Sequence, residues 1–422
     1  MGFVMFLIKS ILQQTWFIFF LCLCEFGQST EYNWFANLRF RGRADKFTAL
    51  GTLGWNTQYS TITEMRSRLG LNVIGNNSSA KFILQDSRLF GHIENNSGFT
   101  NSSGTPFFHQ AFFTFSNLNI PWFQKDFIQI GRFELALGNQ RIIAKNDWNN
   151  IGRSFEGILG ASKVRNNWFS GDLLLMHLFI NETLNSDKED VSIFGFYWNE
   201  KIPRFGEKSH YEFYLLNFRN MKFDSVDDTT ASYNNIGTRI DVQKNNWILE
   251  AESAFQTSMG ASSKDLVEGN LLSFNLGYKL ENMGFFKNII LGVDQISGDD
   301  SATYVGEGFS KEFGAIHKHH GYYDYTSHKK YFGHHHEGLK EINLKANLNI
   351  FPNDKKKTNL LIALHDFKSG VDDIHYGSEI DFIFKTKHNN EISSEFGTIF
   401  YFPTIGNENR LSFYYFIITA NF

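Results

Sequence analysis

The chain has 422 residues, a formal net charge of −4 and 17% aromatic residues, 46 of them phenylalanine, but a hydrophobic fraction of only 42%. This charge excludes a nucleic-acid footprint, and the only two cysteines, Cys22 and Cys24, are too few for a disulfide scaffold. Many aromatic residues without a large apolar total favour aromatic girdles over a thick hydrophobic core.

The first 28 residues have the composition of a secretory signal peptide. A start with a single lysine is followed by the apolar run 16–24 and by small and polar residues at 27–29. The run is short for a membrane-spanning helix, although an uncleaved N-terminal anchor is the alternative. The two cysteines lack the small residues that precede a lipoprotein cysteine. We expect a signal peptide over residues 1–28 and one mature domain over residues 29–422.

Two early segments alternate between polar and apolar side chains. In residues 33–45 the odd positions, apart from Phe35, are polar or charged and the even positions are apolar, and residues 65–73 repeat the pattern. A period of two residues predicts strands with one wet and one apolar face. The wet faces carry Arg39, Arg41, Arg66 and Arg68.

The rest of the chain continues as strands separated by turn clusters and longer polar stretches. No later apolar stretch is long enough for a spanning helix, so a membrane crossing requires a closed barrel. At roughly 22 residues per strand and connection, the 394 mature residues (422 − 28) give about 18 strands. Residues 414–422 end in phenylalanine and resemble the C-terminal recognition strand of Gram-negative outer-membrane proteins. We expect an all-β fold, a transmembrane antiparallel β-barrel of the outer-membrane type. The alternative is a soluble β-sandwich.

Residues 131–157 place charged side chains among phenylalanines, leucines and glycines. An arginine on the lipid face at mid-membrane costs roughly 2–4 kcal/mol, so the arginines of these strands should face the lumen. The two-residue period then predicts that Arg132 and Glu134 point inward and that Phe133 and Leu135 point outward.

Other charged residues share a strand face in the same way. Asp86 and Arg88 do so, and Glu379 and Asp381 lie on the polar side of residues 377–384. Inward arginines would attract anions that carry carboxylate or sulfate, because arginine binds such groups through two hydrogen bonds. The alternative is a structural network in which inward acids neutralise the arginines.

The charged segment resembles the alginate-export family of outer-membrane barrels. The resemblance rests on a Gly-Arg-x-Glu-Leu, Gly-x-x-Arg and Arg-x-Phe-Glu-Gly pattern that spans residues 131–157. Further similarity lies at residues 66–71, 85–88, 110–112, 294–298, 317–324, 338–339 and 377–381. The matching residues of the central motif are Gly131, Arg132, Glu134, Leu135, Gly138, Gln140, Arg141, Trp148, Arg153, Phe155, Glu156 and Gly157.

The resemblance implies a monomeric 18-stranded barrel in the Gram-negative outer membrane, with an arginine-lined constriction that passes an anionic uronate polymer. By motif position it assigns that role to Arg66, Arg68, Arg88, Arg132, Arg141 and Arg153. The full set of candidate lumen residues is Arg39, Arg41, Arg66, Arg68, Asp86, Arg88, Arg132, Glu134, Arg141, Arg153, Asp324, Glu379 and Asp381.

The sequence gives weak signals for metal binding and lacks common enzyme motifs. Histidines gather at residues 317–336, and His334, His335 and His336 are weak metal candidates, but their loose spacing favours a solvated loop. The motifs H-E-x-x-H, G-x-S-x-G, the phosphate loop and C-x-x-C are absent from the sequence. We therefore expect no enzyme activity, no cofactor and no structural metal.

The sequence supports three hypotheses about function. The first is an outer-membrane channel for an anionic polysaccharide such as alginate, with membrane lipid and a periplasmic secretion scaffold as further partners. The second is a general or small-anion uptake porin. The third is a structural or surface-interaction barrel that is plugged by its own charges.

Overall fold

The structure is a computed structural model of the chain. It describes residues 30–45, 60–90, 103, 105–119, 123–165, 170–180, 191–220, 232–258, 266–280, 284–300, 305–311, 313–323, 337–351, 357–404 and 410–422. The expected signal peptide over residues 1–28 lies outside them. No helix in the described part of the chain is long and apolar enough to cross a membrane.

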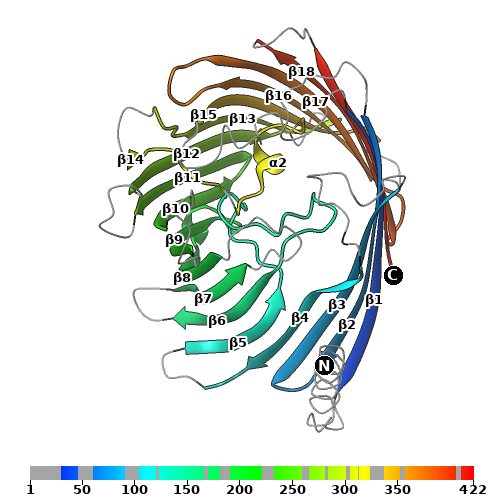
Figure 1. The fold of residues 1–422 in the computed structure, drawn as a ribbon, viewed down its shortest axis with the longest axis vertical. Coiled ribbons are helices and arrows are strands. Elements are labelled where there is room, and N and C mark those ends of the chain that lie inside the picture. Colours follow the sequence, from blue (N-terminus) through cyan, green and yellow to red (C-terminus); the bar gives the residue numbers. More distant parts are fainter. Residues whose placement is uncertain are drawn as a thin grey trace, which may run out of the picture.

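The described chain is almost entirely β-strand (Figure 1). Its two short helical elements are η1 (Pro203–Phe205) and α2 (Ile316–His319). The strands are β1 (Glu31–Asp45), β2 (Ser60–Ile74), β3 (Ser78–Phe90), β4 (Phe107–Ser116), β5 (Phe123–Phe133), β6 (Phe155–Arg165), β7 (Ser170–Ile180), β8 (Val191–Lys201), β9 (His210–Asn220), β10 (Tyr233–Lys244), β11 (Trp247–Ser258), β12 (Leu266–Lys279), β13 (Phe286–Ile296), β14 (Val305–Gly306), β15 (Leu339–Asn349), β16 (Lys357–Lys368), β17 (His375–Lys387), β18 (Ile392–Pro403) and β19 (Leu411–Asn421).

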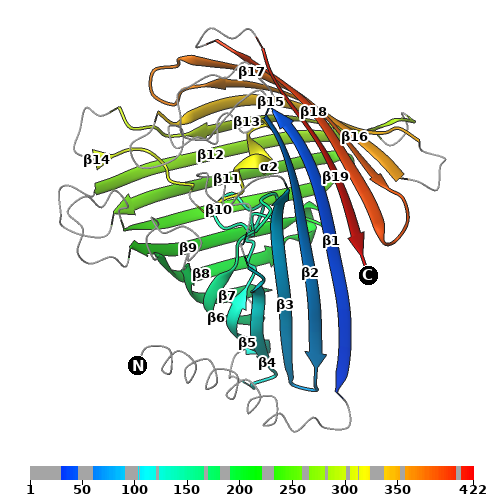
Figure 2. The same ribbon diagram turned by 45° about the vertical axis from the view of Figure 1, so that its right-hand side comes forward.

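These strands form a closed barrel. Each wall strand pairs antiparallel with its neighbours in the sequence, and β1 pairs with β19, with Arg39 opposite Thr419 (Figure 2). The two-residue strand β14 lies outside this order and pairs in parallel with β12. Of the 19 strands in the sheet, 18 (19 − 1) therefore make the wall. The expectation of an antiparallel barrel of about 18 strands is confirmed.

The two rims of the barrel differ in the length of chain that connects the strands. At one rim, β2 and β3 are joined by residues 75–77, and β10 and β11 by residues 245–246. The first and last strands meet at the same rim, where the amide of Phe422 donates to the carbonyl oxygen of Ala36 at 2.9 Å. At the opposite rim, β13 and β15 are separated by residues 297–338. Short and long rims are typical of outer-membrane barrels.

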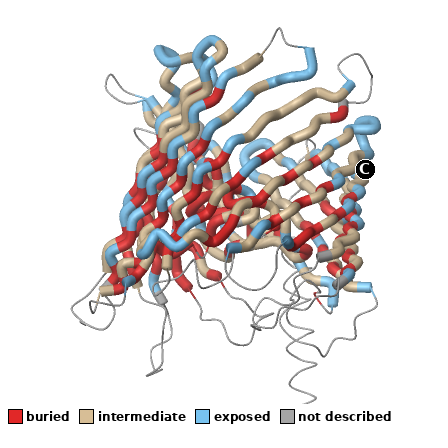
Figure 3. Tube along the Cα trace, turned by 90° about the horizontal axis from the view of Figure 1, so that it is seen from above, coloured by how far each residue is buried: buried red, intermediate tan, exposed pale blue. Residues whose placement is uncertain are grey.

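Along much of the wall, side chains alternate between more exposed and more buried positions (Figure 3). On β1 and β2, Leu38, Phe40 and Leu69 are exposed on the outer face, whereas Arg39 and Arg66 are buried on the inner face. A hydrophobic outer surface is stable only against lipid, which leaves the charged residues to face the lumen. The prediction for these two strands is confirmed.

The prediction for Phe133 and Leu135 is wrong. Both lie in the buried apolar cluster, with exposures of 1% and 8%, and Phe133 packs edge-on against Phe112 at 6.0 Å between ring centroids. The sequence argument assumed a wet lumen. Instead the chain that follows β5 folds into the barrel, and both apolar side chains are buried in the cluster that it helps to form, which is favourable for them.

Arg132 accordingly takes the outer face of β5. It shares this face with Ile130, which is 43% exposed, and it forms an ion pair of 2.7 Å with Glu156 on β6. Glu134 follows the strand and does turn inward, where it approaches Arg68 at 3.2 Å. The pair that the sequence placed on one face is therefore divided between the two faces.

Asp86 and Arg88 are a second correction. They share a face, as expected, but it is the outer one, where they pair with each other at 2.8 Å. Gln85 and Ser87 take the inner face of β3 and are fully buried. Their neutral side chains donate hydrogen bonds of 2.7 and 3.0 Å to main-chain carbonyls of residues 150–151. These carbonyls need hydrogen-bond donors, which neutral side chains supply as well as charged ones.

Phe133→Ala should destabilise the barrel by about 3–5 kcal/mol, the usual cost of emptying a buried phenylalanine site. The matched control is Phe115→Ala, because Phe115 is exposed on the outer face of the adjacent strand and leaves no internal cavity. Unfolding in denaturant, followed by tryptophan fluorescence in detergent, measures both. Equal losses for the two variants would contradict the inward placement of Phe133.

Candidate functional site

The inner faces of β1 and β2 form a surface rich in arginine, which we call the basic wall. The only buried acid among the described side chains of these two inner faces is Glu64, which forms an ion pair with Arg41 and another, of 3.2 Å, with Arg43. The period of two brings the arginines together because successive inward positions on paired strands are neighbours. The basic wall consists of Arg39, Arg41, Arg43, Arg66 and Arg68.

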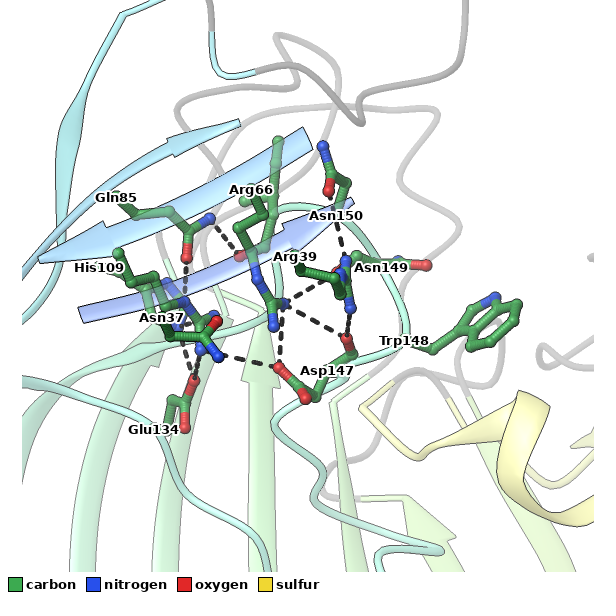
Figure 4. A network of polar contacts seen from close by, with 12 residues as sticks. Asn37, Arg39, Arg66, Gln85, His109, Glu134, Asp147, Trp148, Asn149 and Asn150 are labelled. Atoms are coloured by element: carbon green, nitrogen blue, oxygen red, sulfur yellow. Dashed lines mark hydrogen bonds and ion pairs between the residues drawn. The ribbon is translucent and has the colours of Figure 1, made fainter. Parts of the chain in front are cut away.

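Residues 134–154, between β5 and β6, fold into the barrel and cover the basic wall (Figures 1 and 4). We call them the first inward segment. Arg39 donates to the carbonyl oxygens of Asp147 at 2.6 Å and Asn149 at 3.0 Å, and Arg41 donates to that of Trp148 at 2.6 Å. The arginines thereby satisfy main-chain carbonyls that no strand pairs.

The Asp147 carboxylate also lies against the basic wall. Its Oδ1 atom is 2.9 Å from Nη1 of Arg66 and 3.7 Å from Nη1 of Arg68. Burial by itself raises the pKa of this carboxyl, but the charges of Arg66, Arg68 and Arg39 outweigh it and lower the pKa to about 2. Asp147 is therefore ionised at any physiological pH.

The opposite part of the lumen is lined by carboxylates, which we call the acidic wall. These residues are buried on the inner faces of β9, β11, β13, β15 and β17. Carboxylates in such positions need cationic or hydrogen-bonding partners. The acidic wall consists of Glu212, Glu252, Asp294, Glu341, Glu379 and Asp381.

The first inward segment spans the lumen between the two walls. Arg141, six positions before Asp147, donates both terminal nitrogens to the Asp294 carboxylate, at 2.7 and 3.0 Å. Its Nε atom is 3.9 Å from Glu252. One segment thus brings a carboxylate to the basic wall and a guanidinium to the acidic wall, so each end contacts charge of opposite sign.

A second inward segment, residues 305–311 and 313–323, covers the acidic wall. Lys311 donates to Nε2 of His320 at 2.6 Å, and Nδ1 of the same ring contacts Glu341 at 2.6 Å. Burial, followed by the charge of Lys311, lowers the pKa of His320 to about 4, so the ring is neutral. Burial, followed by the charge of Arg141, lowers the pKa of Lys311 to about 7.

Glu379 holds the end of this second segment. One of its carboxylate oxygens accepts the main-chain N–H groups of Tyr322 and Tyr323 at 2.6 and 2.9 Å. Asp381, two positions along the same strand, is buried with an oxygen 3.4 Å from Nε2 of His365. The two acids therefore lie inside the barrel, as expected, where Glu379 anchors the second inward segment and Asp381 contacts His365 of the wall.

Trp148 joins the two inward segments. Its indole stacks on His317 with 3.6 Å between ring centroids and 17° between planes, and Tyr415 of β19 packs edge-on at 5.1 Å. The Arg41 guanidinium lies 4.6 Å from the indole centroid. Figure 4 shows the side chain turned away from the arginine network toward α2. Arg153 makes a second link, donating to the carbonyl oxygen of Phe313 at 2.6 Å.

The candidate residues thus fall into three groups. Asp86, Arg88 and Arg132 lie on the outer face, and Asp324 and the metal candidates His334, His335 and His336 lie outside the described residues. The others lie inside the barrel, namely Arg39, Arg41, Arg66, Arg68, Glu134, Arg141, Arg153, Glu379 and Asp381.

Sequence reasoning did not identify Asp147, Asp294, Lys311 or Glu341 as site residues. The only signal for Asp147 was its place beside Trp148 within the recognised motif. Glu341 stands on the polar face of residues 341–349, which alternate strictly, so the period of two could have placed it inward. Asp294 sits on a strand of weak alternation, and Lys311 belongs to a polar stretch that is typical of a loop. Their partners are far apart in sequence, so no local pattern could reveal the contacts.

Two groups of described residues have the ligand types and spacing for a metal ion. The first group is Asp294, His320 and Glu341, and the second is a set of acids at residues 299–307. In the first group, Arg141 and Lys311 already contact the ligand atoms and supply positive charge. The arrangement is therefore that of a salt-bridge network.

One family model matches most of the chain. The family model described as "Alginate export" matches residues 32–404. No curated protein matches the sequence.

Solved porins share the fold. A BenF-like porin from Pseudomonas fluorescens has a TM-score of 0.63 and 12% identity over 93% of this chain and 98% of that one. Pseudomonas aeruginosa OpdO has a TM-score of 0.61 and 9% identity over 93% and 97%. Pseudomonas aeruginosa OccK2 (OpdF), solved in complex with glucuronate, has a TM-score of 0.59 and 12% identity over 93% and 98%.

Trp148→Ala should loosen both inward segments, because it removes the ring that His317 and Tyr415 contact. We expect a higher single-channel conductance and more current noise in a planar bilayer. Trp247→Ala is the control, since Trp247 is exposed on the outer face. A conductance unchanged by Trp148→Ala would contradict this role.

The Lys311 amine should make the barrel more stable as pH rises. Its pKa in the folded chain, about 7, lies below the ordinary 10.5, so the folded state binds fewer protons than the unfolded state between these values. The full cost of burying the charged amine is present below about pH 7 and disappears toward pH 10.5. Thermal midpoints in detergent at pH 6, 7.5 and 9 should rise for the wild type more than for Lys311→Met. Parallel midpoints would overturn the assignment.

Proposed function

The chain belongs to the alginate export family of Gram-negative outer-membrane barrels, and from this premise we propose that its lumen passes an anionic polysaccharide of the uronate class. The coarser statement, an outer-membrane channel, follows from the family and from the porin fold. The finer one, the nature of the cargo, is argued from the charges of the lumen.

The observation that carries the proposal is an excess of positive charge at the basic wall. Its five arginines face three carboxylates, those of Glu64, Glu134 and Asp147, which leaves a surplus of two positive charges (5 − 3). Inside low-dielectric walls such a surplus attracts anions strongly. Guanidinium groups bind carboxylates through paired hydrogen bonds, and this geometry favours a carboxylated sugar over a simple spherical anion.

A polymer can pass only if the inward segments move aside. The contacts that hold them are ion pairs and aromatic packing, with no covalent bond among the described contacts, so two arrangements of these segments are physically accessible. A periplasmic secretion scaffold that feeds the polymer into the lumen belongs to the same proposal.

The second candidate is a small-anion porin. Two inward segments occupy the lumen, and OccK2, a porin of the same fold, was solved with glucuronate. The third candidate, a plugged barrel, draws on the salt bridges that cross the lumen. The identity of the cargo separates the first two, and electrical silence identifies the third.

The purified barrel in a planar bilayer should pass anions in preference to cations, and oligouronate should block the current. Arg66→Glu should reduce the anion preference severalfold, because it reverses one charge of the basic wall. Arg88→Glu is the matched control on the outer face. Block by glucuronate without block by oligouronate would favour the small-anion porin, and a silent wild type would overturn both channel proposals.

A further inference from the structure

The contact between Asp147 and the basic wall has the form of a ligand in its site. We propose that Arg39, Arg66 and Arg68 make a subsite for the carboxylate of one uronate residue, and that Asp147 is a built-in competitor that occupies it when no cargo is present. This inference rests on the proposed function, since it names the group of the cargo that the lumen recognises and how its entry is controlled.

Arginines from one strand converge on the Asp147 carboxylate. Arg66 and Arg68 converge on the same oxygen of Asp147, at 2.9 and 3.7 Å, from adjacent inward positions of β2. Arg39, on the neighbouring strand, reaches only the main-chain oxygens of Asp147 and Asn149 and the side-chain amide oxygen of Asn150 at 3.3 Å. Two guanidinium groups therefore share the Asp147 carboxylate, apart from Glu134 beside Arg68, and Arg39 lies next to them on main-chain and amide oxygens.

Two of these arginines have a donor nitrogen without a hydrogen-bond partner among the described residues. Arg39 and Arg66 are only 6% and 4% exposed, yet the Nε atom of each has no hydrogen-bond partner among the described residues. Buried donors of charged groups are normally paired. A carboxylate with two free oxygens, presented by a mobile ligand, could accept more of these donors than Asp147 does from its fixed place in the chain.

The Asp147 carboxylate is the most exposed of the acids that contact these arginines. The Asp147 side chain is 44% exposed. The other acids that contact the arginines of the basic wall, Glu64 and Glu134, are 0% and 17% exposed. A carboxylate that is open to the lumen on one side and held by arginine on the other can be exchanged stepwise by an incoming anion. The Arg41–Glu64 pair, closed on all sides, cannot exchange in this way.

Exchange at this subsite would also affect the first inward segment. Arg39 also binds the main chain of Asp147 and Asn149, Arg41 binds that of Trp148, and the Trp148 ring connects this chain to α2. A uronate carboxylate that displaces Asp147 thus removes one of the contacts that keep the segment against the basic wall. Cargo binding and widening of the lumen are then coupled, because the competitor and the obstruction are parts of one segment.

Asp147→Asn tests the competitor directly, with glucuronate as the probe. The amide keeps the size of the side chain and removes its charge. We expect glucuronate to block the anion current at about tenfold lower concentration, since a site that is free about a tenth of the time binds about tenfold more weakly. Asp147→Glu should behave like the wild type. Asp366→Asn is the control, because Asp366 lies in an ion pair with His375 away from the basic wall.

The double variant Arg66→Gln/Asp147→Asn separates the subsite from a general charge effect. If Arg66 belongs to the subsite, the gain in glucuronate affinity disappears in the double variant. Heat-modified migration in electrophoresis checks that each variant forms the barrel.

An anion-selective wild type whose glucuronate block is unaltered in Asp147→Asn would overturn the competitor while leaving the proposed function intact. An equal gain in Asp366→Asn would do the same, because it would show a nonspecific charge effect. A wild type that neither selects anions nor binds uronate would overturn the proposed function itself.

Discussion

The structure depends on one constraint, that every strand of a closed barrel in lipid must direct its charges inward or neutralise them in pairs. Backbone hydrogen bonds are satisfied between neighbouring strands around the ring, from β1 to β19. Alternate side chains are then forced into the lumen, where buried charged residues such as Arg39, Glu64 and Asp294 lie. The few ionic residues on the outer faces of β3, β5 and β6 occur as the pairs Asp86–Arg88 and Arg132–Glu156.

The inward charges are largely segregated. Arginines predominate on β1 and β2 and carboxylates from β9 to β17, where Arg239 of β10 is the buried exception and pairs with Glu212 at 2.7 Å. The two inward segments bring charges of opposite sign to these two walls. The first brings Asp147 to the arginines and Arg141 to the carboxylates, and the second brings Lys311 and His320 to the carboxylates. The same electrostatics therefore fold the segments into the lumen and leave a cationic surplus on one side, the surface at which we propose that an anionic cargo is recognised.

The success of sequence reasoning followed the length and regularity of the alternation. Arg39 and Arg66 were placed correctly because long strands with apolar residues at every other position admit only one orientation in lipid. Arg132 and Phe133 were reversed because the pattern there is short and the inward packing of Phe133 against Phe112 is a tertiary contact. For Asp86 and Arg88 the charge itself misled, since Gln85 and Ser87 are needed inside to bind the carbonyls of the first inward segment.

By itself the sequence determined the barrel, its number of strands, the faces of its regular strands and its family resemblance. These are consequences of local period and of lipid, and both act on each strand independently of the others. Only the tertiary structure decided which charges meet. Arg141 and Asp294 are 153 positions apart, and Asp147 and Arg66 are 81 positions apart. Such pairs form because chain closure brings distant inner faces together and because a buried charge must find a partner of opposite sign. The local sequence does not encode that choice.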